Sequence, residues 1–259
     1  MKTFTDLQEG VYDPNIFKAF FVAGGPGSGK SFVVRRTTGG LGMKIVNSDD
    51  IFEKYLKDEG LDMKMPKSEK EPRDKLRDRA KRLTARKQEN FIEGRLGLII
   101  DGTGKDYDRI ARQATKLKQI GYDVHMIFVN TSLDVALSRN AKRSRTVPES
   151  IAIKSWNNVQ RNIGKFSQYF RQNFVVVDNN DELENDGTVL NSVFKQIKPL
   201  AKKKATSKLA QAWIAKELED KRNRGAGKKT GIRYKSITVK DKSGKKVGRS
   251  FRQVPYMSG

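Results

Sequence analysis

The chain has 259 residues, with 53 Lys and Arg against 30 Asp and Glu, one His and no Cys, so its formal net charge is +23. The lack of cysteine excludes disulfides and thiolate metal sites, and a single histidine excludes a histidine-cluster metal centre. The sequence has no apolar run of about 18 residues and no secretory leader, so we expect a cytoplasmic protein without a membrane span.

The positive charge is concentrated near the carboxyl end. Residues 201–259 hold 18 Lys and Arg against 4 Asp and Glu, a net +14, whereas residues 1–200 hold 35 against 26, a net +9. Such a basic segment attracts polyanions, and we expect nucleic acid as its partner, with an acidic protein, an acidic membrane surface or mere solubility as alternatives. We therefore expect two domains, residues 1–200 and a basic extension of residues 201–259.

The strongest motif is the stretch from Phe20 to Ser31, FFVAGGPGSGKS, which fits the Walker A pattern G-x-x-x-x-G-K-[ST]. The apolar residues predict a buried strand, and the glycines let backbone N–H groups wrap a phosphate chain. The pattern predicts that Lys30 contacts the β- and γ-phosphates of ATP and that the Ser31 hydroxyl binds Mg²⁺. The phosphate-cradling residues are expected to be Gly25, Gly27, Ser28, Gly29, Lys30 and Ser31.

A second predicted strand, residues 43–47, ends at Ser48-Asp49-Asp50, and a helix is expected to follow. Polar groups beyond the carboxyl end of a strand lie where open α/β sheets place their active sites. One of the two aspartates could instead cap the helix. We take Asp49 as the candidate general base, because a hydroxyl acceptor needs a carboxylate within hydrogen-bond reach.

A long exposed helix is predicted over residues 67–93, followed by a strand over residues 96–100 that ends at Asp101. An apolar strand ending in Asp fits the Walker B pattern, which places a carboxylate near Ser31 and Mg²⁺. A helix from Asp106 to Gly121 and a strand over residues 124–129 come next. The lone His125 lies in that strand and is expected to be a packed side chain without a catalytic role.

A basic helix is predicted within the segment from Leu133 to Pro148, with Arg139 and Arg143 at i, i+4 on one face and Arg145 close behind. The plain alternative is a solvated surface. Since the helix follows the fourth strand of a phosphate-binding sheet, Arg139 and Arg143 could neutralise charge on a transferring phosphoryl group.

The remaining elements continue the alternation of strand and helix, which is typical of a parallel sheet covered on both faces. Thr146 to Glu149 fits a capping box with Pro148 in the first turn. We then expect a helix to Phe170, a strand over 174–177 with a loop over 178–181, helices over 188–201 and from Lys202 to about 220, a linker over 222–231 and a basic hairpin over 232–254.

These motifs resemble the zeta-toxin and phage polynucleotide-kinase group of P-loop kinases. The resemblance rests on GGPGSGKS, VNSDD, LIIDGTG, RNAKRSRTVP and VVVDNN and covers residues 20–181. It implies a P-loop kinase fold, with helices around a five-stranded parallel sheet of order 2-3-1-4-5. Zeta toxins phosphorylate a nucleotide-linked amino sugar, and the phage enzyme phosphorylates a 5′-hydroxyl end.

The resemblance also implies residue roles. Asp49 matches the general base, Asp101 the acidic residue that holds the acceptor or Mg²⁺, and Arg139 and Arg143 the lid arginines on the phosphates. Asn179, in the VVVDNN loop, would lie against the adenine. The polynucleotide kinase has an arginine for the acceptor's phosphate where this chain has Phe52.

The sequence therefore predicts an ATP-dependent and Mg²⁺-dependent phosphotransferase acting on a hydroxyl of a nucleic acid end or of a nucleotide-linked sugar. The alternative is a nucleic-acid-binding ATPase or adaptor in which the basic extension is the main functional element. A third interpretation is a toxin neutralised by an antitoxin-like protein partner.

Overall fold

The structure is a computed structural model that describes residues 10–38, 41–64, 66–143, 145–180, 187–226, 232–240 and 246–255. The chain forms two compact units, Met1–Ala212 and Trp213–Gly259. The expected domain boundary after residue 200 stays a prediction.

A five-stranded parallel sheet of order β2-β3-β1-β4-β5 forms the centre of the first unit, as the resemblance implied. Its strands are β1 Lys18–Ala23, β2 Lys44–Val46, β3 Leu98–Asp101, β4 Asp123–Asn130 and β5 Phe174–Asp178. All six residues of β1 are buried, because helices cover both faces of the sheet. Since all strands are parallel, their carboxyl ends share one edge, here named the carboxyl edge, and their amino ends share the amino edge.

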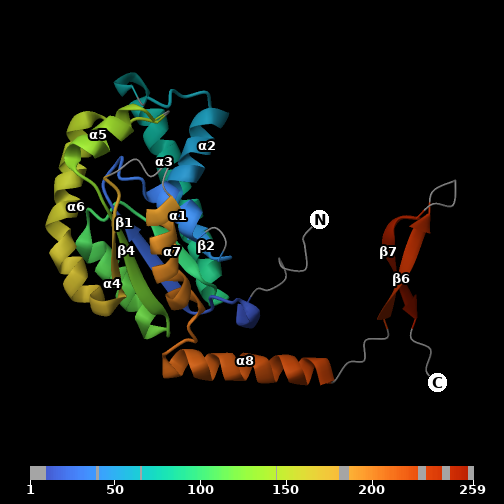
Figure 1. The fold of residues 1–259 in the computed structure, drawn as a ribbon. Coiled ribbons are helices and arrows are strands. Elements are labelled where there is room, and N and C mark those ends of the chain that lie inside the picture. The colour runs from blue at the N-terminus through green and yellow to red at the C-terminus, as the bar shows by residue number, and fades with distance from the viewer. Residues whose placement is uncertain are drawn as a thin grey trace. The chain divides into compact units, whose positions relative to one another are not determined.

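The helices of this unit cover the sheet in two layers, with α1 and α7 on one face and α4 and α6 on the other (Figure 1). Their bounds are α1 Lys30–Thr38, α2 Ser48–Asp58, α3 Lys70–Glu93, α4 Tyr107–Gln119, α5 Leu133–Ala141, α6 Glu149–Phe170 and α7 Gly187–Lys202. Short 3₁₀ turns lie at η2 Gly10–Tyr12, η3 Lys67–Glu69 and η4 Arg171–Asn173. Helices α2 and α3 pack against each other through Phe52, Leu56 and Ala80.

Alternate residues of the strands form two apolar cores. On one face, Phe20 of β1 joins Val33 of α1 and Ile197 of α7 in a buried cluster. On the opposite face, Phe21 packs against Phe170 of α6, with 6.0 Å between the ring centroids. The two cores fix the strand ends at the carboxyl edge, where the polar motifs of the sequence lie.

A part-buried ion pair lies at the amino edge. Lys18 Nζ pairs with Asp123, and Lys18 also donates to Lys204 O at 3.3 Å. The backbone N–H of Thr206 donates to Asp123 Oδ2 at 3.1 Å, and the Thr206 hydroxyl donates to Asp123 Oδ1. The segment after α7 is thereby held on the sheet. Nearby, His125 is buried and stacks on Phe20, and burial, with the Lys18 charge, lowers its pKa to about 4, so the prediction of a packed side chain is confirmed.

Three predicted helix limits are wrong. Helix α5 ends at Ala141, so Arg143 lies beyond it and does not share a helical face with Arg139. The chain turns there because the Asn140 side chain donates to Val147 O at 2.7 Å and accepts from Val147 N at 3.1 Å. Helix α6 begins at Glu149 after Pro148, with no side-chain cap, so the expected capping box does not form.

The third error concerns the basic helix expected to begin at Lys202. Lys202 ends α7 instead, and α8 runs from Lys208 to Ala226, which includes the first residues of the expected linker. In the second unit, β6 Ile232–Lys240 and β7 Lys246–Pro255 pair antiparallel, which confirms the hairpin. Residues 227–231 and 241–245 lie outside the described residues. Among the helices in the described ranges, none combines the length and apolarity needed to cross a membrane.

Candidate phosphoryl-transfer site

The loop between β1 and α1 has no room for side chains at its glycines. Gly27 has φ +80°, and a Cβ there would lie 1.9 Å from Ala136 O of α5. Gly29 has φ +83°, and its Cβ would lie 2.2 Å from Asn179 Nδ2. Backbone amides at such close turns can surround an anion, as the Walker A pattern predicts.

Lys30 is the first residue of α1 and folds back over this loop. Its Nζ donates to Gly24 O at 2.8 Å and to Gly25 O at 2.9 Å. Burial lowers the pKa of Lys30, and the charge of Arg143 adds to this, against the opposing charges of Asp101 and Asp49. A triphosphate would offer this ammonium stronger acceptors than two neutral carbonyls. Ser31, which follows, is exposed in the first turn of α1.

Asp101 ends β3 and has one oxygen in use. Asn47 Nδ2 donates to Asp101 Oδ2 at 3.0 Å, while the buried Oδ1 has no hydrogen-bond partner in the part of the chain that the structure describes. Burial, together with the charges of Asp49 and Asp50, raises the pKa of Asp101 to about 6, against the opposing charge of Lys30. A carboxylate oxygen in this state is a suitable ligand for a hard cation such as Mg²⁺.

Asp49 lies in the first turn of α2, and its carboxylate does not cap the helix. The cap of α2 is Asn47, whose side chain accepts from Asp49 N at 2.7 Å, so the suggestion that one of the two aspartates caps the helix is wrong. The half-exposed carboxylate of Asp49 pairs through Oδ2 with Arg145 Nη2 at 3.1 Å.

Arg145 is a member of the site that we named but to which we gave no role. It is 5% exposed, and its Nε donates to Glu53 Oε1 at 2.7 Å in addition to the Asp49 contact. Burial opposes its charge, but Asp49 and Glu53 outweigh burial and raise the pKa of Arg145. The available signal was the i, i+4 spacing of Asp49 and Glu53, which gives helix α2 two carboxylates on one face.

Arg139 and Asn179 connect α5 and β5 to the phosphate loop. Arg139 Nη1 donates to Asn179 O at 2.6 Å, and Asn179 Nδ2 donates to Ser28 O at 2.7 Å. Asn179 N also donates to Asn130 O at 2.9 Å, at the end of β4. Asn179 thus holds the phosphate loop through its side-chain hydrogen bond to Ser28 O. The adenine contact expected of Asn179 stays a prediction.

Trp156 of α6 is a supporting residue that sequence reasoning missed. Its indole Nε1 donates to Thr131 O at 3.0 Å, and a Cβ on Gly25 would lie 3.1 Å from its Cδ1. The ring therefore packs against the phosphate loop. A tryptophan among the apolar residues of a helix gives no sign of this from sequence.

The described residues contain no group of three or more His, Cys, Asp or Glu side chains that could hold a metal by themselves. Arg143 is exposed and contributes through its charge, which acts on the pKa of both Lys30 and Asp101. The carboxyl edge thus brings together the predicted lysine, the two aspartates and the loop, with Arg139 bound to Asn179.

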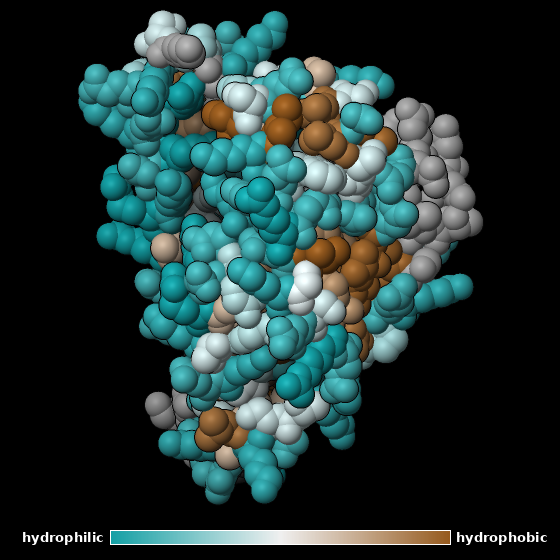
Figure 2. All heavy atoms as spheres, turned by 90° about the vertical axis from the view of Figure 1, so that its left-hand side faces the viewer, coloured by the Kyte–Doolittle hydropathy of each residue, from teal (hydrophilic) through white to brown (hydrophobic). Residues whose placement is uncertain are grey.

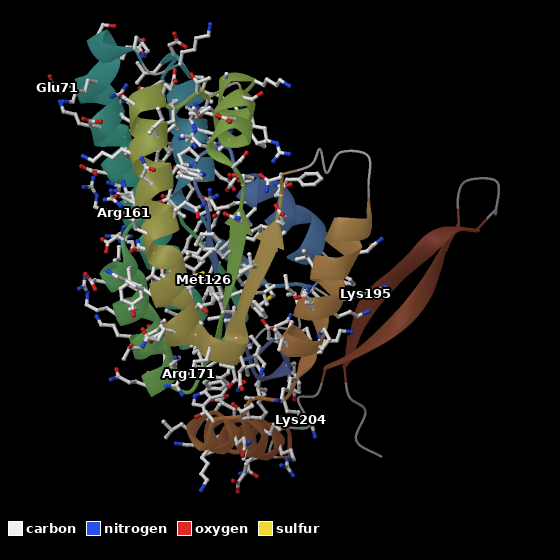
Figure 3. All side chains as sticks on the ribbon, turned by 60° about the vertical axis from the view of Figure 1, so that its left-hand side comes forward. Glu71, Met126, Arg161, Arg171, Lys195 and Lys204 are labelled. Atoms are coloured by element: carbon white, nitrogen blue, oxygen red, sulfur yellow. The ribbon has the colours of Figure 1, made fainter. Side chains whose placement is uncertain are left out.

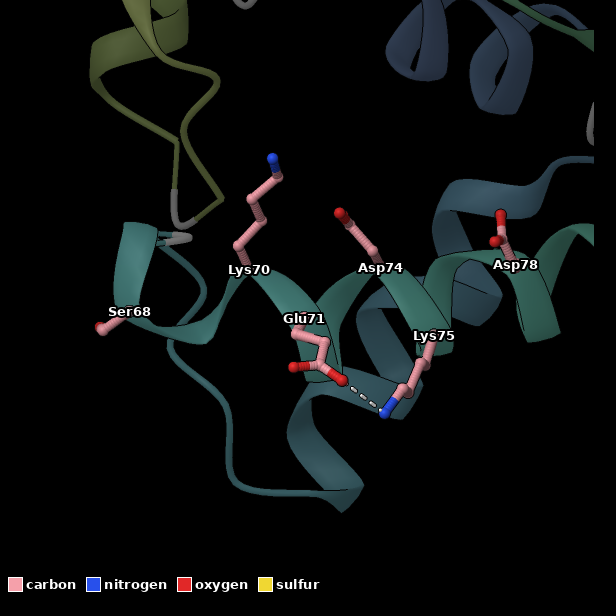
Figure 4. Close-up of a pocket in the computed structure, with 6 residues that line it drawn as sticks. All are labelled: Ser68, Lys70, Glu71, Asp74, Lys75 and Asp78. Carbon is pink, nitrogen blue, oxygen red and sulfur yellow. Dashed lines mark hydrogen bonds and ion pairs between the residues drawn. The ribbon is translucent and has the colours of Figure 1, made fainter.

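A separate hollow of about 560 Å³ lies on the charged surface of η3 and α3. It is lined by Ser68, Lys70, Glu71, Asp74, Lys75 and Asp78, none of which belongs to the phosphate loop. Figure 4 shows Lys70 and Asp74 projecting from one side of the helix, while Glu71 and Lys75 pair at 2.8 Å elsewhere on it. We assign the hollow no part in phosphate binding.

Comparison with known proteins identifies the family of the chain. The model of the zeta toxin family matches residues 6–186. No curated protein matches the chain. Solved structures include shikimate kinase from Acinetobacter baumannii in complex with shikimate, at 16% identity, 72% of this chain, 93% of that chain and a TM-score of 0.44.

Two others are similarly distant. A gluconokinase from Sinorhizobium meliloti 1021 has 15% identity over 81% of this chain and 98% of its own, with a TM-score of 0.41. A chain of the Pnkp1/Rnl/Hen1 RNA repair complex has 19% identity over 59% of this chain and 47% of its own, with a TM-score of 0.46. The family match covers well over half of the chain and has the phosphate loop within it, and the chain belongs to the zeta toxin family of P-loop kinases.

Proposed function

We propose that this P-loop kinase transfers the γ-phosphoryl group of ATP to a hydroxyl of a nucleotide-linked sugar, with Asp49 as the general base. The observation that carries the proposal is the position of Asp49: Asn47 bonds its backbone and Arg145 holds its carboxylate, while Asn47 also bonds Asp101. A carboxylate beside the phosphate-binding residues is what a hydroxyl acceptor needs.

ATP would bind with its phosphates in the glycine loop. Lys30 would exchange the carbonyls of Gly24 and Gly25 for phosphate oxygens. Ser31 and Asp101 fit Mg²⁺, because the buried Asp101 Oδ1 has no partner among the described residues. When bound by these residues, Mg²⁺ would supply positive charge against the charge of the phosphates.

The arginines would act on charge and position. Arg139 and Arg143 are proposed to contact the phosphates, which requires Arg139 to leave Asn179 O. Arg145 is proposed to hold the Asp49 carboxylate beside the acceptor hydroxyl, because its guanidinium pairs with that carboxylate. Phosphoryl transfer asks mainly for such positioning and charge neutralisation.

Two observations favour a nucleotide-linked sugar over a nucleic acid end. The family match supports the sugar, since that is the acceptor that the resemblance to zeta toxins implies, whereas the resemblance to the polynucleotide kinase implies a nucleic acid end. Phe52 is 1% exposed and packs in the core of α2 and α3, so it supplies no contact to an acceptor phosphate. A 5′-hydroxyl nucleic acid end remains the second acceptor to test.

The test is transfer of labelled γ-phosphate with Mg²⁺, offering a panel of nucleotide sugars beside 5′-hydroxyl RNA and DNA. Label on a nucleotide sugar is the expected result. Label only on an oligonucleotide would make a nucleic acid end the acceptor in place of the sugar. Label on neither substrate would overturn both proposed acceptor classes. The Lys30→Met protein serves as the blank.

The basic extension supports a second candidate function, a nucleic-acid-stimulated ATPase or adaptor, because residues 201–259 carry a net +14. Its test is ATP hydrolysis with and without nucleic acid in the full chain and in a chain that ends at Ala226. Stimulation lost on truncation would favour it. The third interpretation, a toxin neutralised by an antitoxin-like protein partner, is tested by whether an added partner protein blocks phosphoryl transfer.

A further inference from the structure

Two neighbouring surface helices, α4 and α6, are basic and have acidic residues only in their first turns. From Arg109 to Tyr122, and again from Ser150 to Asn173, the sequence has no Asp or Glu. Six of the exposed cations define a surface here named the α4–α6 basic face: Arg112, Lys116 and Lys118 on α4, Arg161 and Lys165 on α6, and Arg171 just after it. Figure 2 shows the molecule from this side, where hydrophilic side chains predominate.

Contacts around two tyrosines place the cations of the two helices side by side. Lys118 Nζ of α4 lies 4.1 Å from the ring centroid of Tyr169 on α6, and Lys165 Nζ of α6 lies 5.7 Å from that of Tyr107 on α4. The centroids of the two rings are 6.5 Å apart, and Thr115 Oγ1 lies 2.7 Å from Tyr169 OH. The two helices therefore present one continuous surface, along which Arg161 and Arg171 can be followed in Figure 3.

Helix α3 shows what a compensated basic helix of this protein is like. It has nine Lys and Arg but also five Asp and Glu. Two of its lysines pair within the helix, Lys75 with Glu71 at 2.8 Å and Lys81 with Asp78 at 3.2 Å. The cations of the α4–α6 basic face have no carboxylate within 4.0 Å in the described residues.

This arrangement of charges lowers the stability of helices α4 and α6. Arg112 with Lys116, and Arg161 with Lys165, are like charges at i, i+4, which destabilise a helix by a few tenths of a kcal/mol each. A surface that needed only solubility would gain from alternating signs, as on α3. Uncompensated cations on an ordered surface are instead what a polyanion needs, since each contact releases counterions.

We propose that the α4–α6 basic face binds the phosphodiester backbone of nucleic acid. At 1.5 Å of rise per residue, the part of α6 from Arg161 to its end at Phe170 is about 14 Å long, which corresponds to about four phosphates of one duplex strand. Backbone binding of this kind carries no base sequence preference. The residues of this face all belong to the first unit. The proposal holds whatever hydroxyl accepts the phosphoryl group.

The experiment compares two charge-reversed forms of the full chain. One carries Arg112→Glu, Lys116→Glu and Arg161→Glu, and the matched control carries Lys75→Glu, Lys81→Glu and Lys87→Glu on α3, so the net charge changes equally. Binding of mixed-sequence RNA and duplex DNA of about 20 nucleotides is measured by fluorescence anisotropy at several salt concentrations. Thermal melting confirms that both variants fold, and a triple Gln form of the first set provides a milder change.

We expect the α4–α6 variant to bind at least about tenfold more weakly and its salt slope to fall by about 2 to 3, because three phosphate contacts are lost. The Gln form should lie between it and wild type, and the α3 control should keep the wild-type slope. Equal weakening of both variants, or none, would overturn the proposal. Face-dependent binding to vesicles that contain phosphatidylserine, without binding to nucleic acid, would overturn it as well.

Discussion

Two lysine–aspartate sets lie at opposite edges of one sheet and are arranged in opposite ways. At the amino edge, Lys18 and Asp123 form a direct ion pair completed by Thr206. Burial raises the pKa of Asp123, but the hydrogen bonds from Lys18 and Thr206 outweigh burial and leave it below its usual value. At the carboxyl edge, Lys30 bonds two backbone carbonyls, and burial lowers its pKa while it raises that of Asp101 to about 6.

The same residue types, lysine and aspartate, therefore have a structural role at the amino edge and a proposed functional role at the carboxyl edge. The amino-edge pair satisfies its own charges and holds the chain after α7 on the sheet. The carboxyl-edge residues keep hydrogen-bonding and charge capacity for a ligand, at a cost in stability. Substitutions at one edge should therefore change stability, and substitutions at the other should change activity.

The largest contrast is expected between Lys30→Met and Lys18→Met. Lys30→Met should reduce phosphoryl transfer by about 10³-fold, because a cation on the phosphates is lost, with little loss of stability. Lys18→Met should lower the free energy of unfolding by about 3–5 kcal/mol, because Asp123 is left without its buried partner. Urea unfolding and labelled phosphate transfer measure the two effects, and a stable Lys18→Met protein without activity would reverse the comparison.

Arg145 tests whether the carboxyl edge also contains a structural ion pair. Arg145→Met should lower kcat by about 10- to 100-fold with unchanged ATP affinity, because Asp49 loses its support. Arg145→Lys should recover part of this, since one ammonium cannot make both contacts of the guanidinium fork. Glu53→Gln is the control that leaves the Asp49 contact in place. Weaker ATP binding as the main effect would assign Arg145 to the phosphates instead.

Asp101 and Asp123 should make the stability of the protein depend on pH in opposite directions. The pKa of Asp101 lies above its usual 3.8, so its contribution to stability falls as pH rises from about 4 to about 6. Asp101→Asn removes the group that ionises, so it should remove this loss of stability and raise the free energy of unfolding at pH 7 by about 1–3 kcal/mol. Asp123 contributes stability above its usual pKa and loses it as pH falls, so Asp123→Asn should destabilise at pH 7. Thermal melting between pH 4 and 7.5 measures both, and melting shifts of the same sign would contradict the comparison.

Thr206→Val should have the smallest effect. It removes the hydroxyl hydrogen bond to Asp123 but keeps the backbone one, so we expect a loss of about 1 kcal/mol with unchanged phosphoryl transfer. Urea unfolding checks the first value and a kinase assay the second. A fall in activity would show that the two edges are coupled.

The sheet and the phosphate loop could be predicted because their signals are local. The glycine pattern, the apolar strands and the aspartate at the end of β3 each lie within a few residues. The contact of Arg145 with Glu53 joins positions 92 apart, and nothing in either segment names the other. The end of α5 was missed because the Asn140 side chain takes over the backbone groups of Val147, an option that helical periodicity does not show.

The central claim, that Asp49 is the base of a phosphotransferase, is tested most directly by comparing Asp49→Asn with Asp50→Asn, its exposed neighbour in the same helical turn. Transfer of γ-phosphate to the acceptor and the Kd for ATP are measured on both proteins. We predict that Asp49→Asn loses about 10²- to 10⁴-fold in transfer with ATP affinity retained, whereas Asp50→Asn stays within about threefold of wild type. Wild-type transfer by the Asp49→Asn protein would contradict the account.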